Sequence, residues 1–234
     1  MSHFLLGVII PEDLSDVESY LEMTLEPYDE NTEVAPYQRP CRCGERQARR
    51  QADAIAAEET GLTWDTLRQS FAQKPEAEQT PKAWERHTKR LREAEARELA
   101  RLPKTPQADC DYCHGSGTYT STYNPKSKWD WWQIGGRWDG VLAGTPAENE
   151  DGLNFGPNPE RLGNNLVRVE DLTRERMPFA FVLPDGTWLQ QGEMGGWGIV
   201  HREDISPEMW ETKTLDALKA RYGGLRVVAV DCHI

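Results

Sequence analysis

Four of the five cysteines in this 234-residue chain occur in two close pairs, and these side chains are well suited to hold a metal ion. Cys41 and Cys43 form a C-x-C pair, and Cys110 and Cys113 form a C-x-x-C pair. Positions i and i+2 of extended backbone point to the same side, and a C-x-x-C turn brings its two sulfurs together. Because four thiolates around one ion are typical of structural zinc, the spacing predicts a closed zinc site.

The number and setting of the cysteines favour a metal over disulfides. The count is odd, and the N-terminus lacks the basic region and cleavage site of a signal peptide, so we expect reduced thiols. Two disulfides, or four unrelated buried thiols, are the alternatives. His114 follows Cys113 and could replace one sulfur, but we favour the four cysteines. We expect the fifth cysteine, Cys232, to be a buried and unreactive thiol.

The second pair lies within residues 110–117, which have the form C-x-x-C-x-G-x-G. This segment is similar to one cysteine-rich repeat of the DnaJ-type chaperones. The resemblance is confined to this single copy and implies a zinc knuckle, not chaperone activity. Since four thiolates leave no open position for a water molecule, a zinc ion held there would be structural rather than catalytic.

A second group of polar residues has the side-chain types for acid–base chemistry. A carboxylate beside a histidine can orient it as a general base, and an arginine can hold a phosphate. If the protein is an enzyme, we expect a small hydrolase or transferase acting on a nucleotide-like substrate through Asp130, Arg137, Asp231 and His233, with Asp139 and His201 as further candidates. The chain has no phosphate-binding loop, G-x-S-x-G or H-E-x-x-H motif, and the sequence therefore leans against an enzyme.

Tryptophan is abundant, with nine in the chain and four of them within residues 129–138. One interpretation is core packing, because aromatic side chains dominate protein cores. The other is an exposed recognition surface for a protein or a nucleobase, since Trp and Arg often anchor interfaces. The residues of that surface would be Trp129, Trp132, Arg137 and Trp138. Gly135 and Gly136 would let the backbone bend or let another group approach closely.

Charge and hydropathy exclude some classes of protein. The formal net charge of −12 argues against general affinity for the nucleic-acid backbone. Residues 1–40 hold nine acidic side chains and one arginine, which predicts either a solvated helix face or a surface that meets a basic partner. No apolar run reaches the roughly 18 residues of a membrane span, and we expect a cytoplasmic protein.

The elements that must position these groups can be read from the hydrophobic pattern. An apolar strand at 4–10 precedes a helix with Ser15 as its expected N-cap, and a hairpin follows at 179–190 around Pro184-Asp185-Gly186. A helix begins at Ser206-Pro207, and a buried strand covers 225–230. This order predicts an α+β fold with a ferredoxin-like β-α-β-β-α-β core, whose first and last strands form the central pair.

The predicted core comprises residues 1–40 and 118–234. Residues 41–117 form a predicted helical insertion, in which Thr63 and Thr80 are expected to cap two of the helices. The insertion begins and ends at the cysteine pairs. A metal ion would therefore clamp its two ends together and remove the entropy of an open loop.

One further resemblance concerns residues 123–138, which read YNPKSKWDWWQIGGRW. This run resembles a signature of a family of actinobacterial phage and prophage proteins. The likeness extends to PYDEN at residues 27–31 and to the terminal DCHI. The resemblance implies a phage setting and no particular activity. Together with the acidic surface and the closed metal site, it predicts a protein that engages a host protein, such as a defence or nucleic-acid enzyme.

Overall fold

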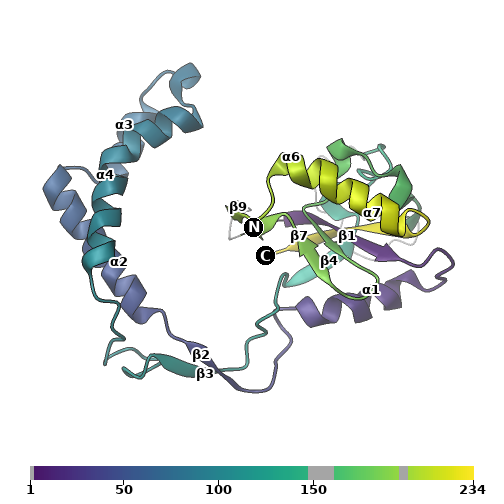
Figure 1. Cartoon of the computed structure of the whole chain (residues 1–234), viewed down its shortest axis with the longest axis horizontal. Helices are drawn as coiled ribbons and strands as arrows, with labels where there is room; N and C mark the ends of the chain where they lie inside the picture. The colour runs from purple at the N-terminus through teal and green to yellow at the C-terminus, as the bar shows by residue number, and fades with distance from the viewer. Residues whose placement is uncertain (1–2, 147–160, 195–199) are drawn as a thin grey trace. The chain divides into compact units, whose positions relative to one another are not determined.

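The computed structural model describes residues 3–146, 161–194 and 200–234 (Figure 1). The chain divides into two compact units, one made of Met1–Val34 and Tyr123–Ile234 and the other of Ala35–Thr122. Both helices and strands are present, which confirms the predicted α+β class. The second unit extends beyond the predicted insertion at both ends, because it includes the two strands that flank the cysteine pairs.

The first unit is built on a six-stranded sheet with the order β4-β10-β1-β6-β7, in which β5 also pairs with β10. Its strands are β1 (His3–Ile10), β4 (Trp131–Ile134), β5 (Leu166–Arg168), β6 (Ala180–Val182), β7 (Trp188–Gln190) and β10 (Arg226–His233). β1 and β10 are antiparallel along their whole length, from the pair His3–His233 to the pair Ile10–Arg226. The first and last strands are therefore the central pair, as predicted.

The order of the remaining strands does not confirm the ferredoxin-like core. β6 lies directly beside β1 and parallel to it, and β7 lies outside β6. A split β-α-β arrangement would place another strand between the two parallel ones. The predicted hairpin itself is present, since Val182 pairs with Trp188 across a turn in which Gly186 donates to the carbonyl of Leu183.

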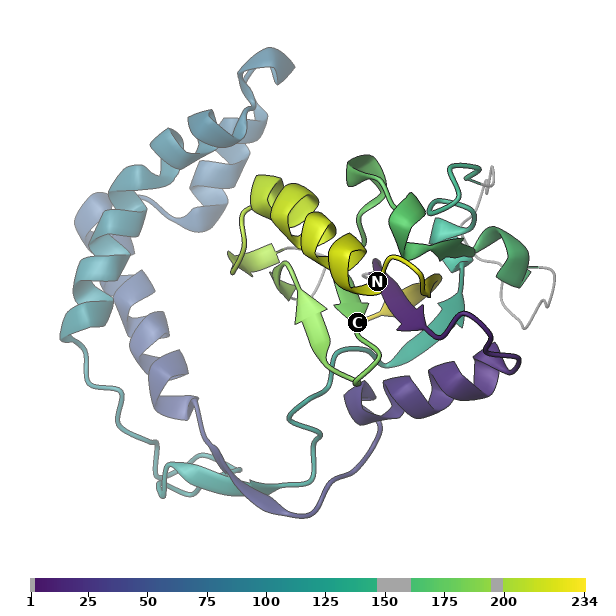
Figure 2. The same cartoon turned by 45° about the vertical axis from the view of Figure 1, so that its right-hand side comes forward.

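Helices cover both faces of this sheet (Figures 1 and 2). They are α1 (Val17–Leu25) on one face, and α6 (Pro207–Met209), the π-helical segment η7 (Trp210–Thr214) and α7 (Leu215–Tyr222) on the other. Side chains of β1 alternate between two cores: Leu6 and Val8 pack with α1, whereas Leu5 and Ile9 pack with Trp210 and α7. The apolar run of β1 is therefore explained by burial on both faces.

The remaining elements of the first unit are short. They are η1 (Glu26–Tyr28), η3 (Gly136–Trp138), α5 (Arg161–Asn164), η4 (Val169–Asp171), η5 (Arg174–Arg176) and the paired strands β8 (Gly192–Met194) and β9 (Val200–Glu203). The N-cap of α1 is Asp16, whose carboxylate accepts from the backbone N–H of Ser19, and the expectation for Ser15 was wrong by one residue.

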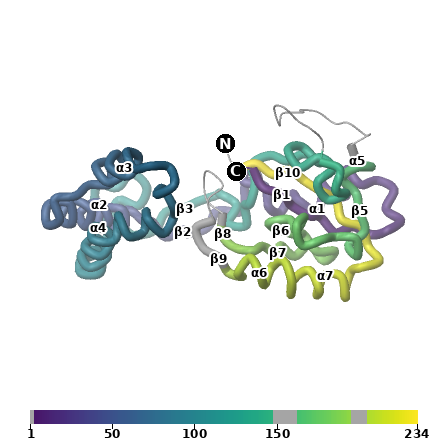
Figure 3. The backbone as a smooth tube through the Cα atoms, turned by 90° about the horizontal axis from the view of Figure 1, so that it is seen from above, coloured from purple at the N-terminus to yellow at the C-terminus, as the bar shows by residue number. Residues whose placement is uncertain are grey.

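The second unit combines a two-stranded sheet with a helical hairpin (Figure 3). Its elements are β2 (Tyr37–Pro40), α2 (Cys43–Thr60), α3 (Trp64–Ala72), η2 (Glu76–Glu78), α4 (Pro81–Arg101) and β3 (Thr118–Ser121). α2 buries Ala48, Ala52 and Ala56, one alanine on each turn, which lets its backbone approach α4 closely. Thr63 and Thr80 cap α3 and α4 as predicted.

No helix within the described parts of the chain has both the length and the apolar character needed to cross a membrane.

Candidate metal centre

The four predicted cysteines lie together, and their sulfur atoms are all within 4.8 Å of one another. The sulfurs of Cys41 and Cys110 are 3.7 Å apart, and those of Cys43 and Cys113 are 3.6 Å apart. A disulfide would need about 2.05 Å. A tetrahedral zinc with bonds of about 2.3 Å has sulfur–sulfur edges of about 3.8 Å. All four cysteines are free, and the cluster could hold one metal ion.

Two segments that are distant in the sequence supply the ligands. Cys41 follows β2, and Cys43 is the first residue of α2. The other pair lies just before β3, which runs antiparallel to β2 in the register Pro40–Thr118. This pairing continues into the site, where the backbone N–H of Cys41 donates to the carbonyl of Gly117 at 2.8 Å. The β2–β3 ladder therefore brings the two cysteine pairs to the same place.

The knuckle at residues 110–117 depends on left-handed backbone. His114, Gly115 and Gly117 all have positive φ, of 46°, 85° and 81°. A side chain at Gly117 would come within 3.0 Å of the ring of Pro106, which explains the second glycine of the C-x-x-C-x-G-x-G pattern. The side chain of His114 is exposed and does not belong to the cluster, so the four-cysteine set is the one that the geometry supports.

Two positions that we did not predict, Gly44 and Gln107, contribute to the packing and hydrogen bonding around the cysteine cluster. Gly44 lies against the carbonyl oxygens of Lys104 and Thr105, and a Cβ there would approach them to 2.4 and 2.5 Å. The same returning segment places the backbone N–H of Gln107 3.3 Å from the sulfur of Cys43, to which it donates. Such hydrogen bonds orient a thiolate ligand. The glycine directly after the C-x-C pair was the available sequence signal.

The electrostatics of the cluster differ from one thiol to another in the metal-free protein. For Cys113, burial favours the neutral thiol, but the backbone N–H groups of Gly117 and Gly115 and the neighbouring thiols prevail and lower its pKa to about 7. For Cys41, the backbone N–H of Cys43 favours the thiolate, but burial and the hydrogen bonds to neighbouring thiols raise its pKa to about 12. A metal ion would have to displace the remaining protons.

The fifth cysteine lies elsewhere. Cys232 is fully buried in the core beneath α1. Burial first, and the neighbouring Asp231 second, raise its pKa well above the ordinary value. A thiol in this state is a poor nucleophile, in agreement with the expectation that it is unreactive.

Three of the predicted acid–base residues form two histidine–carboxyl pairs, together with a second histidine, where the ends of β1 and β10 adjoin. His233 Nδ1 is 2.5 Å from Asp130 Oδ1, and His3 Nδ1 is 2.9 Å from Asp231 Oδ1. The two imidazoles meet edge to face with 5.0 Å between ring centres, and Trp131 stacks on His233. His3 was not predicted. Its only signal was its place at the start of the first strand, which pairs with the last.

The other members of the predicted pocket do not converge as expected. Asp231 is fully buried, and its second oxygen accepts from the backbone N–H of Arg137 at 3.0 Å, while the Arg137 side chain is exposed. Asp139 accepts from the side chain of Asn165. Gly136 has a φ of 55°, and a Cβ there would lie 2.3 Å from Asp231 Oδ2, so the close approach predicted for the glycine pair is real. The side chain of His201 lies outside the described residues.

The predicted tryptophan surface is divided between the two faces of the sheet. Trp129 is 6% exposed and, with the half-buried Trp132, packs in the core beneath α1. Trp138 packs against the opposite core, and only Arg137 is exposed. These residues do not form one exposed surface, and their positions match the core-packing interpretation instead.

Comparison with known proteins adds no family. The scan of protein-family models, the search of curated proteins and the search of solved structures each found no match to this chain.

Proposed function

We propose that this protein is a zinc-containing binding protein of phage type, which acts in a host cell by engaging a host protein such as a defence enzyme or a nucleic-acid enzyme. The observation that carries the metal part is the spacing of the four sulfurs, which matches the edges of a zinc–thiolate tetrahedron. Thiolates favour zinc over magnesium or calcium. The four sulfurs fill every position of such an ion, which supports a structural role.

The binding part of the proposal rests on the acidic face of α1. This helix buries Val17, Leu21 and Leu25 and exposes Glu18 and Glu22. The exposed Glu26, its C-cap, continues the row, so that the three glutamates follow one another at every fourth residue. None of these three glutamates forms an ion pair within the described part of the chain. Met23, 65% exposed, lies beside them and offers an apolar contact. A row of unpaired acidic groups with an adjoining methionine suits a basic protein partner.

The test combines metal analysis with a matched pair of charge reversals. Elemental analysis of the purified protein should return about one zinc per chain. Immobilised wild-type protein should capture a host protein from an actinobacterial lysate, and Glu18→Lys/Glu22→Lys should lose it. Glu208→Lys/Glu211→Lys makes the same change in charge at exposed positions of the same unit and should retain the partner. Equal capture by both variants, or no capture by wild type, would contradict the binding proposal.

A second candidate function, hydrolysis or group transfer on a nucleotide-like substrate, is favoured by one observation. If Nδ1 of His233 carries the proton, it donates to Asp130, which leaves Nε2 as a base. This Nε2 is buried and has no hydrogen-bond partner among the residues that the structure describes. His233→Ala and Asp130→Ala should each abolish function without unfolding if the protein is an enzyme. Both should leave partner capture nearly unchanged if it is a binding protein.

A further inference from the structure

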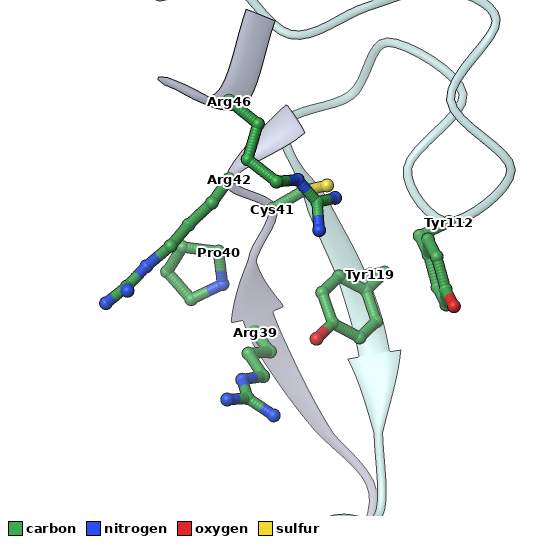
Figure 4. Close-up of a pocket in the computed structure, with 7 residues that line it drawn as sticks. All are labelled: Arg39, Pro40, Cys41, Arg42, Arg46, Tyr112 and Tyr119. Atoms are coloured by element: carbon green, nitrogen blue, oxygen red, sulfur yellow. The ribbon is translucent and has the colours of Figure 1, made fainter. Parts of the chain in front are cut away.

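We infer that the second unit carries a binding site for single-stranded nucleic acid beside the cysteine cluster. The site is a surface hollow of about 450 Å³, lined by Arg39, Pro40, Cys41, Arg42, Arg46, Tyr112 and Tyr119 (Figure 4). Among the described residues, no carboxylate side chain contributes to its lining. We call these seven residues the arginine–tyrosine hollow. Nothing in the proposed binding of a host protein requires it.

The positions of the three arginines follow from the same elements that build the cysteine cluster. Arg39 lies on β2, Arg42 is the N-cap of α2, and Arg46 lies one turn into that helix. Arg42 and Arg46 are exposed and form no ion pair within the described part of the chain. The N-terminal end of α2 adds partial positive charge to the same place. A chain of phosphates would therefore meet a concentrated positive potential here.

The two tyrosines supply flat surfaces next to these cations. Tyr112 lies between the two cysteines of the knuckle and is 66% exposed, and Tyr119 is the cross-strand partner of Arg39. Their ring centres are 5.6 Å apart. Figure 4 shows the Arg46 side chain extending past Cys41 toward Tyr119, with Tyr112 beyond. Aromatic rings beside a basic groove stack on unpaired bases, whereas the bases of a duplex are covered by their neighbours.

The net charge of −12 argues against affinity for nucleic acid, but this charge is not shared equally by the two units. Residues 35–122 contain 15 Lys and Arg against 13 Asp and Glu, whereas the rest of the chain contains 12 against 26. The overall acidity therefore belongs to the other unit. A nucleic acid would bind the second unit locally, with few phosphate contacts and a modest affinity.

One competing role for the arginines must be separated from this one. A zinc ion with four thiolates carries a formal charge of about −2, and nearby cations would stabilise it. Arginines that serve only the metal would change the zinc content when they are removed. They would not require the exposed Tyr112 and the half-buried Tyr119 at the same hollow.

The experiment measures fluorescence anisotropy of zinc-loaded, full-length protein with labelled oligonucleotides of about 12 residues. We expect oligo(dT) or oligo(U) to bind with a dissociation constant of about 1–100 µM at low salt. The logarithm of the binding constant should fall with the logarithm of salt concentration with a slope of about −2, as three phosphate contacts imply. A duplex of the same length should bind more weakly.

Matched variants assign the binding to the hollow. Arg42→Ala/Arg46→Ala should weaken binding and reduce the salt slope by about 1.4. Arg86→Ala/Arg90→Ala, with the same spacing on exposed turns of α4, should change it little beyond the loss of general charge. Tyr112→Ala should weaken binding about 5- to 150-fold, whereas Tyr112→Phe should retain it.

Several outcomes would overturn the inference. They are the absence of binding, equal effects of the two arginine pairs, or heparin or an acidic peptide binding in place of the oligonucleotides with no effect of Tyr112→Ala. Loss of zinc from Arg42→Ala/Arg46→Ala, with oligonucleotide affinity unchanged once zinc is restored, would assign the arginines to the metal instead.

Discussion

The sulfur atoms of Cys41 and Cys110 lie 3.7 Å apart, although 69 residues separate them in the chain. That distance is too long for a disulfide and fits one edge of a metal–thiolate tetrahedron. Cys41 precedes the helical segment of the second unit and Cys110 follows it, so the contact brings the two ends of that segment together. Closing so long a loop with a metal bond should contribute substantially to the stability of the second unit.

Removal of one ligand should therefore release the metal and loosen the second unit. In Cys110→Ser we expect the zinc content to fall from about one to below about 0.1 per chain, because three sulfurs no longer close the tetrahedron. Circular dichroism and elemental analysis measure the two effects. Cys232→Ala, in the core of the other unit, should retain the zinc. Equal zinc content in the two variants would reject the site.

The affinity for zinc should fall as the pH falls. The pKa of Cys113 is lowered from 9.0 to about 7, so its thiolate contributes to folding above pH 9 and this contribution is lost as the pH falls through about 7. Cys41, whose pKa is raised to about 12, keeps its proton until the metal displaces it. For each thiol that must lose a proton to bind zinc, the affinity for zinc falls tenfold with every pH unit by which the pH falls. Below about pH 7 Cys113 is protonated as well, and the affinity should then fall by a further factor of ten per pH unit. Competition with a chromophoric chelator between about pH 6 and pH 8 measures this, and a flat profile would contradict it.

The buried pair His3–Asp231 should matter more for stability than the pair His233–Asp130. Asp231 is fully buried and is bonded to both His3 Nδ1 and the backbone N–H of Arg137. Asp231→Ala would leave these two groups without an acceptor and should lower the free energy of unfolding by about 3–5 kcal/mol. The side chain of Asp130 is 31% exposed, and Asp130→Ala should cost at most about 1 kcal/mol. Urea unfolding gives both values. A similar loss of unfolding free energy in the two variants would contradict the larger contribution that we expect from the buried pair.

Gly136 should tolerate a side chain less well than Gly186, although both have positive φ. At Gly186 a Cβ would meet no atom of the described residues within 4 Å, and Gly186→Ala should lower the free energy of unfolding only by the backbone strain of about 1–2 kcal/mol. At Gly136 the Cβ would also collide with Asp231, and Gly136→Ala should cost clearly more. Thermal unfolding of the two variants separates strain from collision. Equal shifts in Tm would exclude the collision.

The sequence by itself determined the local features of this protein. The spacing of the cysteines identified the ligands, since i, i+2 and i, i+3 geometry depends only on the nearby backbone. The hairpin at Pro184-Asp185-Gly186 and the caps at Thr63 and Thr80 are likewise set by neighbouring residues. The single shifted cap, at Asp16, involved two adjacent residues that are both good caps.

Only the tertiary structure decided which distant residues meet. The sequence does not reveal whether β6 or β7 lies beside β1, because both strands carry similar apolar side chains and the choice depends on packing. The pairing of His3 with Asp231, the division of the tryptophans between two cores and the support of Gly44 by residues 104–105 arise from strand register and chain return. Such contacts join positions that are far apart in the chain, and side-chain type and spacing cannot specify them.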